Sequence, residues 1–278
     1  MQKKKLTDAD RGQTMSAYAI PDMAGYVLLP GDPHRIRLMA SQWEEAREHE
    51  FIRGARGASG RYKGAFISAV STGMGGPSAE DVIVGTAEQG AHTLIRIGTT
   101  GSICEEIRIG DIIINDASVR FDGTSSQYVC PEYPAAASYE VTLALIQAAE
   151  RLNVRYHVGT GYTAASFFTG QQRPSFGGYR RARMEEEMQD LMSAKVINEE
   201  MEAATLFTLS RIFGLRSGMC ACVVAERMTG RYESNAEGIE KACRIGAEAV
   251  SILTEWDRRK KAAGKKYYYP ELEGEKQG

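Results

Sequence analysis

Segment 167–173 combines residue types that could bind a flat, polar ring. Phe167 and Phe168 are followed by Gly170, Gln171 and Arg173. Aromatic faces pack against planar rings, an amide offers both a donor and an acceptor, and a guanidinium offers donors only. A ring edge with two carbonyl acceptors and one N–H donor, as in uracil, matches this set. On its own, however, the segment is better explained as a surface turn at Gly170 whose polar side chains face water.

Arg96 interrupts an otherwise apolar stretch that begins at Thr93 and reads as a strand. A buried guanidinium needs paired anions and satisfied donors, so Arg96 should contact a carboxylate, a phosphate or both. The ends of strands in open α/β sheets are also where ligands bind. A purely structural ion pair explains the residue equally well.

A second cation, Arg35, lies near the expected start of a helix. Residues 26–29 predict a buried strand, after which Asp32 and Pro33 can cap and begin a helix that runs to about Glu45. Arg35 then falls in the first turn, where a cation opposes the helix dipole unless an anion binds at the same end. The alternative is an exposed side chain turned to solvent.

The glycine-rich stretch 71–78 follows a second predicted strand at 66–70. Its three glycines permit unusual dihedrals and the close approach of a ligand, but they could equally serve tight packing. Ser78, with Asp81 three residues later, resembles a capping box for a helix that reaches about Gln89.

Two carboxylates, Glu200 and Glu202, lie between a short predicted strand at 196–198 and a helix that reaches Phe213. Carboxylates are favoured at a helix N-terminus, so capping alone explains them. A role in binding sugar hydroxyls becomes attractive only if Arg96 lies opposite.

The composition is that of an ordinary globular protein. The 278 residues are 43% hydrophobic and 25% charged, which allows a sizeable core. The net charge of -2 gives no general attraction to nucleic acid, so a small anionic substrate would need locally placed cations. No apolar run is long enough to cross a bilayer, so no membrane partner is expected.

Five cysteines without paired zinc-type spacing are expected to be free thiols. Cys220 and Cys222 lie in an apolar run and should be buried on a strand. Residues 1–8 begin with basic side chains but no apolar segment follows, so a secretory signal is not expected. Together these features predict a cytoplasmic protein.

Strands and helices alternate along most of the chain, which predicts an α/β fold without a linker. Further strands are expected at 109–119, 158–165 and 218–225, and further helices at 139–152, 184–192 and 236–261. The ordered core should span about 20–261, and residues 262–278 should form a frayed, flexible tail. Residues 174–183, rich in Gly and Arg, suggest a mobile, exposed flap.

Several of these segments together resemble the nucleoside phosphorylase family, which includes uridine-cleaving and hexameric purine-cleaving enzymes. The matches occur in the family's order between about residues 26 and 255, at segments 30–35, 71–78, 96–101, 167–173 and 200–202. The resemblance implies one domain over 1–278, with a central mixed β-sheet that forms a partly closed barrel flanked by helices. It also implies a pentosyltransferase whose substrates are a nucleoside and inorganic phosphate, with no cofactor.

The resemblance also implies a role for each residue of a substrate site. Gly31, Arg35, Arg96 and Thr99 would bind phosphate, whereas Glu200, Met201 and Glu202 would hold the ribose. In the uridine-cleaving branch a G-Q-x-R motif reads the pyrimidine, and here it falls on Gln171 and Arg173, with Phe167 beside the ring and Arg227 as a tether. Arg96, Glu202 and Arg173 would be the catalytic residues.

The chain departs from the family pattern at several positions. The family usually donates an Arg to the phosphate from a neighbouring subunit, just before a Glu-Phe pair, and here His49 takes that place. Glu226 stands where the uridine branch tends to have Asn and the purine branch an acidic residue. Relatives assemble as a trimer of dimers with shared active sites, so a homohexamer is expected. Some relatives bind a monovalent cation such as K⁺ between subunits, at positions that match Glu50 and Ser78.

The leading functional prediction is reversible phosphorolysis of uridine to uracil and ribose 1-phosphate, a reaction of nucleoside catabolism and pyrimidine salvage. Phosphorolysis of purine nucleosides, with Glu226 as the acid near the base, is an alternative. A nucleoside-binding protein without catalysis and a nucleosidase that uses water are two others. The pairing of Arg35 with Arg96 argues against hydrolysis, because a hydrolase has little need to concentrate phosphate.

Overall fold

The computed structural model describes residues 20–51 and 54–273, and within them one mixed sheet of eleven strands. The strand order is β11-β10-β6-β8-β9-β5-β1-β4-β3-β2, and β7 pairs with β6. The strands are β1 (Tyr26–Pro30), β2 (Glu44–Glu50), β3 (Arg56–Tyr62), β4 (Ala65–Val70), β5 (Thr93–Ser102), β6 (Ile112–Phe121), β7 (Ala135–Ala136), β8 (Tyr156–Ala164), β9 (Asn198–Glu200), β10 (Arg216–Glu226) and β11 (Arg231–Tyr232).

Five of these strands close into a barrel. β5 pairs with β10 in parallel, β10 with β6 antiparallel, β6 with β8 in parallel, β8 with β9 in parallel, and β9 with β5 antiparallel. The short strand β9 therefore completes the ring, and β1, β4, β3 and β2 extend the sheet from β5. The predicted α/β fold with a mixed sheet and a barrel is confirmed.

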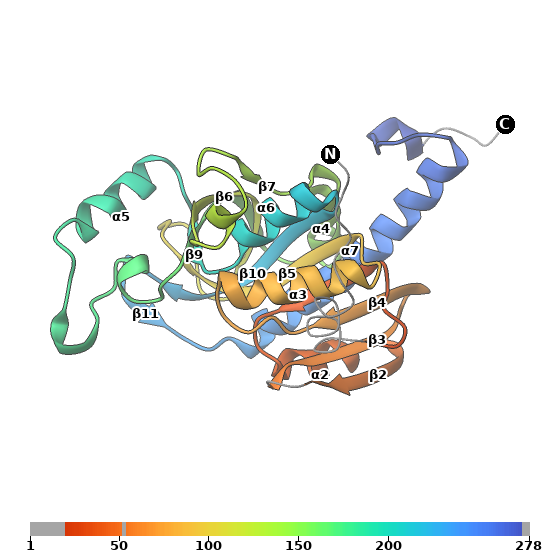
Figure 1. The fold of residues 1–278 in the computed structure, drawn as a ribbon, viewed down its shortest axis with the longest axis horizontal. Coiled ribbons are helices and arrows are strands. Elements are labelled where there is room, and N and C mark those ends of the chain that lie inside the picture. Colours follow the sequence, from red (N-terminus) through yellow and green to blue (C-terminus); the bar gives the residue numbers. More distant parts are fainter. Residues whose placement is uncertain (1–19, 52–53, 274–278) are drawn as a thin grey trace.

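Helices cover both faces of the sheet (Figure 1). They are α2 (His34–Ala40), α3 (Gly76–Glu88), α4 (Tyr139–Arg151), α5 (Met184–Ser193), α6 (Ala203–Phe213) and α7 (Ala236–Ala262), with 3-10 turns η2 (Ser125–Gln127), η3 (Thr169–Gln171), η4 (Phe176–Gly178) and η5 (Pro270–Glu273). Figure 1 shows α5 projecting from one end of the molecule and the last turns of α7, with η5, from the other.

The buried side chains form two main clusters, one on each face of the sheet. Leu28 of β1 belongs to the cluster that includes α2, α4 and α7, whereas Val27 and Leu29 belong to the cluster under α3 and α6. This alternation follows from the two-residue period of a strand. Cys220 and Cys222 are buried free thiols on β10, as predicted.

The helix expected to run to Glu45 ends at Ala40, so the second half of that prediction is wrong. Residues 44–50 instead form β2, which pairs with β3 alone and lies at the end of the sheet. An edge strand can be mostly exposed and charged because only one side of it is paired. β3 was also missed, because two of its seven residues, Gly57 and Gly60, are typical of turns.

The capping box predicted at Ser78 is wrong as well. α3 begins at Gly76, so Ser78 lies inside its first turn, and the Ser78 hydroxyl donates to the carbonyl of Thr72. The residue before the helix is Gly75, whose φ of 87° favours glycine. The glycine-rich stretch therefore folds back on itself before the helix begins.

The chain after α7 turns back against α7 and α4 up to residue 273, so the frayed tail expected from residue 262 is wrong for this part. The ring of Tyr268 stacks on Trp256, with centroids 3.8 Å apart and planes at 12°. The backbone N–H of Tyr268 donates to buried Glu140 at 2.9 Å, and Leu272 is also buried. Residues 274–278 lie outside the described residues, as do residues 1–8 discussed above.

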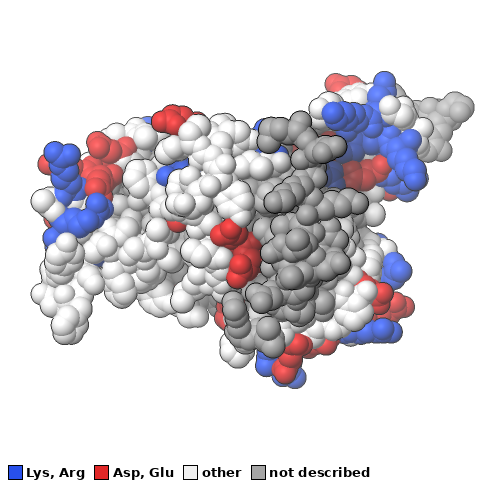
Figure 2. Space-filling view, viewed as in Figure 1, with Lys and Arg blue, Asp and Glu red and all other residues white. Residues whose placement is uncertain are grey.

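Charged side chains of both signs are mixed on the face of the molecule shown in Figure 2, notably over α5 and near the end of α7. This face has no continuous basic stripe among its described residues, in keeping with the net charge of -2. No helix in segments 20–51 and 54–273 is both long and apolar enough to cross a membrane.

We predict that Tyr268→Ala lowers the free energy of unfolding by about 2–4 kcal/mol, because it removes a buried ring and its stack on Trp256. Chemical denaturation measures the change. Tyr267→Ala is the matched control, since Tyr267 is 59% exposed and its loss should change stability by less than about 0.5 kcal/mol. Equal effects of the two variants would show that the C-terminal segment does not pack as described.

Candidate active site

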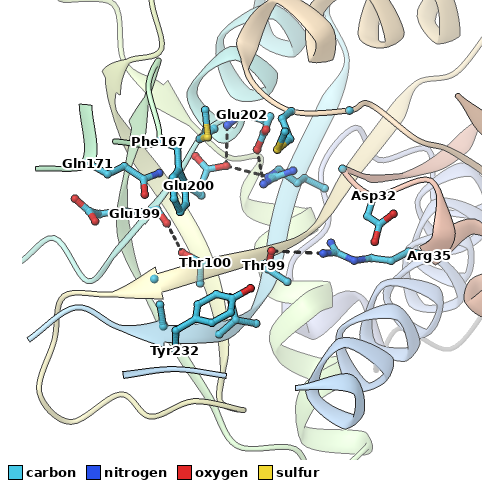
Figure 3. Close-up of a pocket in the computed structure, with 18 of the residues that line it drawn as sticks. Asp32, Arg35, Thr99, Thr100, Phe167, Gln171, Glu199, Glu200, Glu202 and Tyr232 are labelled. Carbon is cyan, nitrogen blue, oxygen red and sulfur yellow. Dashed lines mark hydrogen bonds and ion pairs between the residues drawn. The ribbon is translucent and has the colours of Figure 1, made fainter. Parts of the chain in front are cut away.

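A cavity of about 480 Å³ opens where the parallel strands β1, β5 and β10 end. Ligands of α/β proteins bind at this edge, beyond the carboxyl ends of strands. Figure 3 shows Asp32 and Arg35 at one end of the cavity and Phe167, Gln171 and Glu199 at the other, with Thr99 between them. The sequence segments that carried the functional prediction therefore meet in one place.

Arg35 lies at one end of the cavity without a carboxylate partner among the described ion pairs. Its Nη1 donates to the carbonyl of Ile97 at 3.1 Å, and its Nη2 lies 3.4 Å from Oγ1 of Thr99. Burial, together with the positive charge of Arg96, lowers the pKa of Arg35. Two guanidinium groups near each other in a partly buried cavity attract an anion.

Gly31 lies directly after β1 and brings its backbone close to this end of the cavity. A Cβ at Gly31 would lie 3.2 Å from the carbonyl oxygen of Gly73 and 3.8 Å from Nη1 of Arg96. The backbone N–H of Gly73 donates to the carbonyl of Gly31 at 3.0 Å. This hydrogen bond joins the 71–78 stretch to the end of β1. The absence of a side chain at Gly31 leaves space beside Arg96.

Arg96 of β5 forms a buried ion pair with each of two glutamates. Its Nε donates to Glu200 at 2.9 Å, and its Nη2 contacts Glu202. Burial lowers the pKa of Arg96, but the charges of Glu202 and Glu200 outweigh it and raise the pKa above its usual value. The carboxylate contact that a buried guanidinium requires is therefore present.

Glu200 and Glu202 are each fixed by backbone donors as well. Glu200 accepts from the backbone N–H of Glu202 at 2.8 Å and of Ala203 at 3.0 Å, so it caps the N-terminus of α6. Glu202 accepts from the backbone N–H of Gly75 at 2.5 Å, and burial raises its pKa. Glu200 therefore caps α6, whereas the Glu202 carboxylate bonds to the start of α3 instead, and both carboxylates lie opposite Arg96.

The turn that follows β8 forms the other end of the cavity. Phe167, Gln171 and Arg173 line it, and the Arg173 guanidinium lies 4.7 Å from the centroid of the Phe167 ring. Phe167 is 48% exposed whereas Gln171 is buried. The segment is a turn, as the simpler interpretation held, but its aromatic ring and polar side chains face the cavity rather than only solvent.

Arg227, just after β10, lies behind this turn rather than in the cavity lining. Its Nη2 donates to the backbone carbonyl of Gln171 at 2.8 Å, and its Nη1 lies 3.2 Å from Glu199. Arg227 thus contacts the turn that carries Gln171, and its expected role as a tether stays a prediction.

The structure does not bring every candidate residue to the cavity. His49, Glu50 and Ser78 do not line it: Glu50 pairs with Arg56 at 3.1 Å, and Nε2 of His49 is buried without a hydrogen-bond partner among the described residues. These three positions were expected to act at a subunit boundary, which a single chain does not contain. Across residues 20–51 and 54–273, no group of three or more His, Cys, Asp or Glu is arranged to hold a metal.

Glu226 also lies outside the cavity. Its carboxylate accepts from the backbone N–H of Ile109 at 3.2 Å and from the hydroxyl of Thr229 at 3.3 Å. The Glu226 carboxylate is therefore hydrogen-bonded to the loop before β6 and to the turn after β10.

Sequence reasoning missed Glu199, which lines the cavity and is 1% exposed. It also missed Asp32 as a lining residue, and Tyr232. Glu200 and Glu202 were interpreted as carboxylates at the start of a helix, and Glu199, which precedes them, was not singled out. A strand assignment for 198–200 would have signalled that these carboxylates enter a barrel wall.

Comparison with known proteins agrees with this geometry. The sequence profile of the phosphorylase superfamily matches residues 26–255. A uridine phosphorylase of Thermococcus kodakarensis is 48% identical over 277 residues, which cover 98% of this chain and 99% of that protein.

More distant relatives have related names. A uridine phosphorylase of Escherichia coli is 35% identical and covers 85% of this chain and 92% of its own length. A guanosine phosphorylase of Halorubrum lacusprofundi is 28% identical and covers 84% of this chain and 95% of its own length. On the matched profile and the near full-length similarity, the chain belongs to the phosphorylase superfamily.

Proposed function

We propose that this chain is a uridine phosphorylase, which converts uridine and inorganic phosphate reversibly into uracil and ribose 1-phosphate. The observation that carries the proposal is a single cavity with Arg35, Arg96 and Thr99 at one end and Phe167, Gln171 and Arg173 at the other. The relatives named uridine phosphorylase, at 48% and 35% identity, support the choice of base.

In the proposed reaction, phosphate binds beside Arg35, Thr99 and the backbone at Gly31. Arg35 supplies a cation without a carboxylate partner, and Arg96 lies close enough to share the anion. The attacking phosphate oxygen forms a bond to the anomeric carbon while the bond from that carbon to the uracil nitrogen breaks. Holding the nucleophile in place removes much of the entropic cost of this step.

The ribose lies between the two ends, beside Met201 and Glu202. A carboxylate accepts hydrogen bonds from two neighbouring hydroxyls, and Glu202 is itself held by Arg96 and the backbone of Gly75. Glu200 supports this arrangement from behind, since its oxygens are already taken by Arg96 and the start of α6. The sugar is thereby oriented for attack.

Negative charge develops on the uracil as the glycosidic bond breaks. Donors from Arg173 and the amide of Gln171 stabilise that charge more in the transition state than in the ground state, which is the condition for catalysis. Phe167 packs on the ring. Neither a cofactor nor a covalent intermediate is part of this proposal.

Phosphorolysis of purine nucleosides is the second candidate, favoured by the guanosine phosphorylase relative at 28% identity. Its expected acid, Glu226, is bound to Ile109 and Thr229 outside the cavity, which weighs against it. A nucleoside-binding protein without turnover and a hydrolase are the further alternatives, and each has a distinct outcome in the assay below.

The proposal extends to assembly and location. We place the enzyme in a homohexamer built as a trimer of dimers, in which His49 of a neighbouring copy approaches the phosphate. The proposed assembly also holds a K⁺ ion between subunits, at Glu50 and Ser78. A cytoplasmic location is supported by the five free cysteines.

We predict that uracil is released from uridine only when phosphate is present. Chromatography of the products with and without phosphate, for uridine and for inosine, tests this directly. Undiminished base release without phosphate would establish a hydrolase, cleavage of inosine but not uridine would establish the purine alternative, and uridine binding without turnover would establish a binding protein.

We predict that Arg35→Ala raises KM for phosphate by about one to two orders of magnitude, because it removes a charged hydrogen-bond donor from the anion site. Its KM for uridine should change little. Arg37→Ala is the matched control, since Arg37 is an exposed arginine on the same helix and does not line the cavity. A larger effect on uridine than on phosphate would reverse the assignment of the two ends.

We predict that Arg173→Ala lowers kcat/KM for uridine by about 10²–10³-fold, the usual effect of removing a donor that faces developing negative charge. Steady-state kinetics with saturating phosphate measures it. Arg211→Ala, which removes an exposed arginine on α6, should leave the value unchanged. Wild-type kinetics in the Arg173 variant would remove this residue from the reaction.

A further inference from the structure

Glu199 is a buried carboxylate at the base end of the cavity for which neither the family resemblance nor the relatives supply a role. It lies in β9, opposite Gly101 of β5 and Tyr162 of β8, and its side chain is fully buried. Neither carboxylate oxygen accepts a hydrogen bond from the described residues. Figure 3 shows Glu199 near Gln171 at the edge of the cavity.

Two arginines share the space in front of Glu199. A Cβ at Gly101 would lie 3.4 Å from Cγ and Cδ of Arg227 and 3.6 Å from Nη2 of Arg173, so both side chains pass over the same glycine. Burial lowers the pKa of Arg173, and the charge of Arg227 lowers it further, whereas Glu199 opposes both effects. Without Glu199 the two cations would face each other unbalanced.

Contacts link Glu199 to the base-binding turn through Arg227. Oε2 of Glu199 lies 3.2 Å from Nη1 of Arg227, whose Nη2 donates to the carbonyl of Gln171 at 2.8 Å. The ion pair lacks hydrogen-bond geometry, and Nη1 of Arg227 and Nε of Arg173 are likewise buried without hydrogen-bond partners. Such unpaired groups are costly unless a ligand or ordered water joins them.

We propose that Glu199 is a positioning residue for cleavage of the base. Its carboxylate holds Arg227 in place, Arg227 fixes the backbone at Gln171, and Arg173 remains free to face the leaving uracil. This inference rests on the proposed uridine phosphorylase function. It adds Glu199 as a residue that positions the side chains expected to bind the base.

The charge balance explains why the carboxylate suits this position. With Glu199 ionised, the group formed by Arg173, Arg227 and Glu199 carries one net positive charge, which matches a leaving uracil with one negative charge. With Glu199 protonated, two unbalanced cations repel each other and Arg227 loses its anchor. The third titratable group that faces Glu199, Tyr162 of β8, stays neutral, since burial raises its pKa to about 12.

Glu199 should change its charge in the range in which the enzyme is assayed. Burial raises its pKa to about 7, against the lowering effect of Arg227 and Arg173. Above this value the carboxylate is ionised and holds Arg227, and below it the anchor is lost. The contribution of Glu199 to catalysis should therefore disappear as the pH falls through about 7.

Comparison of Glu199→Gln with the wild type tests this inference. We expect kcat/KM for uridine at about pH 8 to fall roughly tenfold in the variant, while KM for phosphate is unchanged. The ratio of kcat/KM for uridine in the wild type to that in the variant should decline toward one below about pH 7. Because phosphate titrates equally in both assays, its titration does not affect this ratio. A ratio that stays constant with pH, or that equals one throughout, would overturn the inference.

Glu226→Gln is the matched control, because Glu226 is a buried glutamate beside Arg227 in sequence whose carboxylate bonds elsewhere. The ratio of kcat/KM for uridine in the wild type to that in Glu226→Gln should be near one and independent of pH. If Glu199 acts through Arg227, then Glu199→Gln should cost less than about twofold in an Arg227→Gln background. A full additional loss in that background would contradict the proposed linkage.

Glu199→Asp keeps the acid and serves if the Gln variant does not fold. Where Glu199→Gln folds, the kcat/KM of Glu199→Asp for uridine should rise with pH relative to that of Glu199→Gln. Where Glu199→Gln does not fold, the acid limb of the pH profile of Glu199→Asp should be displaced from that of the wild type. An aspartate variant with the wild-type profile would overturn the inference. If the wild type itself releases no uracil from uridine with phosphate, the proposed function fails instead, so the two failures are distinguishable.

Discussion

The buried ion pairs of Arg96 with Glu200 and Glu202 are the interaction on which the site depends. Taking three charged groups out of water costs several kcal/mol per ion, and their mutual attraction offsets this only when the remaining donors and acceptors are satisfied. Here the start of α6 satisfies Glu200, and the backbone of Gly75 satisfies one oxygen of Glu202. The glycine-rich turn, β5 and the start of α6 must therefore be in place together, and the same contacts leave the cavity between them.

The closed barrel gives these charges their precise positions. β9 has only three residues, yet it pairs with both β5 and β8 and so completes the ring. Only two residues separate it from α6, so Glu200 lies at the helix N-terminus and Glu199 in the barrel wall. The short strand thus serves both the ribose region and the base end, and a shift of its register would displace the two together.

The sequence allowed an α/β fold and most of the helices to be predicted, because long apolar strands such as β5 and β10 have few other interpretations. The barrel, in contrast, was implied only by the family resemblance. Arg96 stood out for the same reason, as one charge in an apolar strand. The failures lie where local chemistry is ambiguous. β2 is a charged edge strand whose first two residues were assigned to a helix, and the segment after α7 is polar except for the few rings, such as Tyr268, that anchor it. Glu199 was missed because its burial depends on barrel closure, a long-range pairing that local sequence does not encode.

Charge counting at the phosphate end connects the fold to the proposed assembly. Arg96 contacts two carboxylates, those of Glu200 and Glu202, and Asp32 also lines this end of the cavity. Among the described residues lining the cavity, Arg35 is the one cation at this end without a carboxylate in contact. A phosphate dianion carries two negative charges, whereas Arg35 supplies one positive charge. β2, with its exposed row of charged residues and His49, lies at the edge of the sheet, where another copy can approach it. A cation supplied by another copy would offset part of this negative charge, which is a physical reason to propose a shared active site.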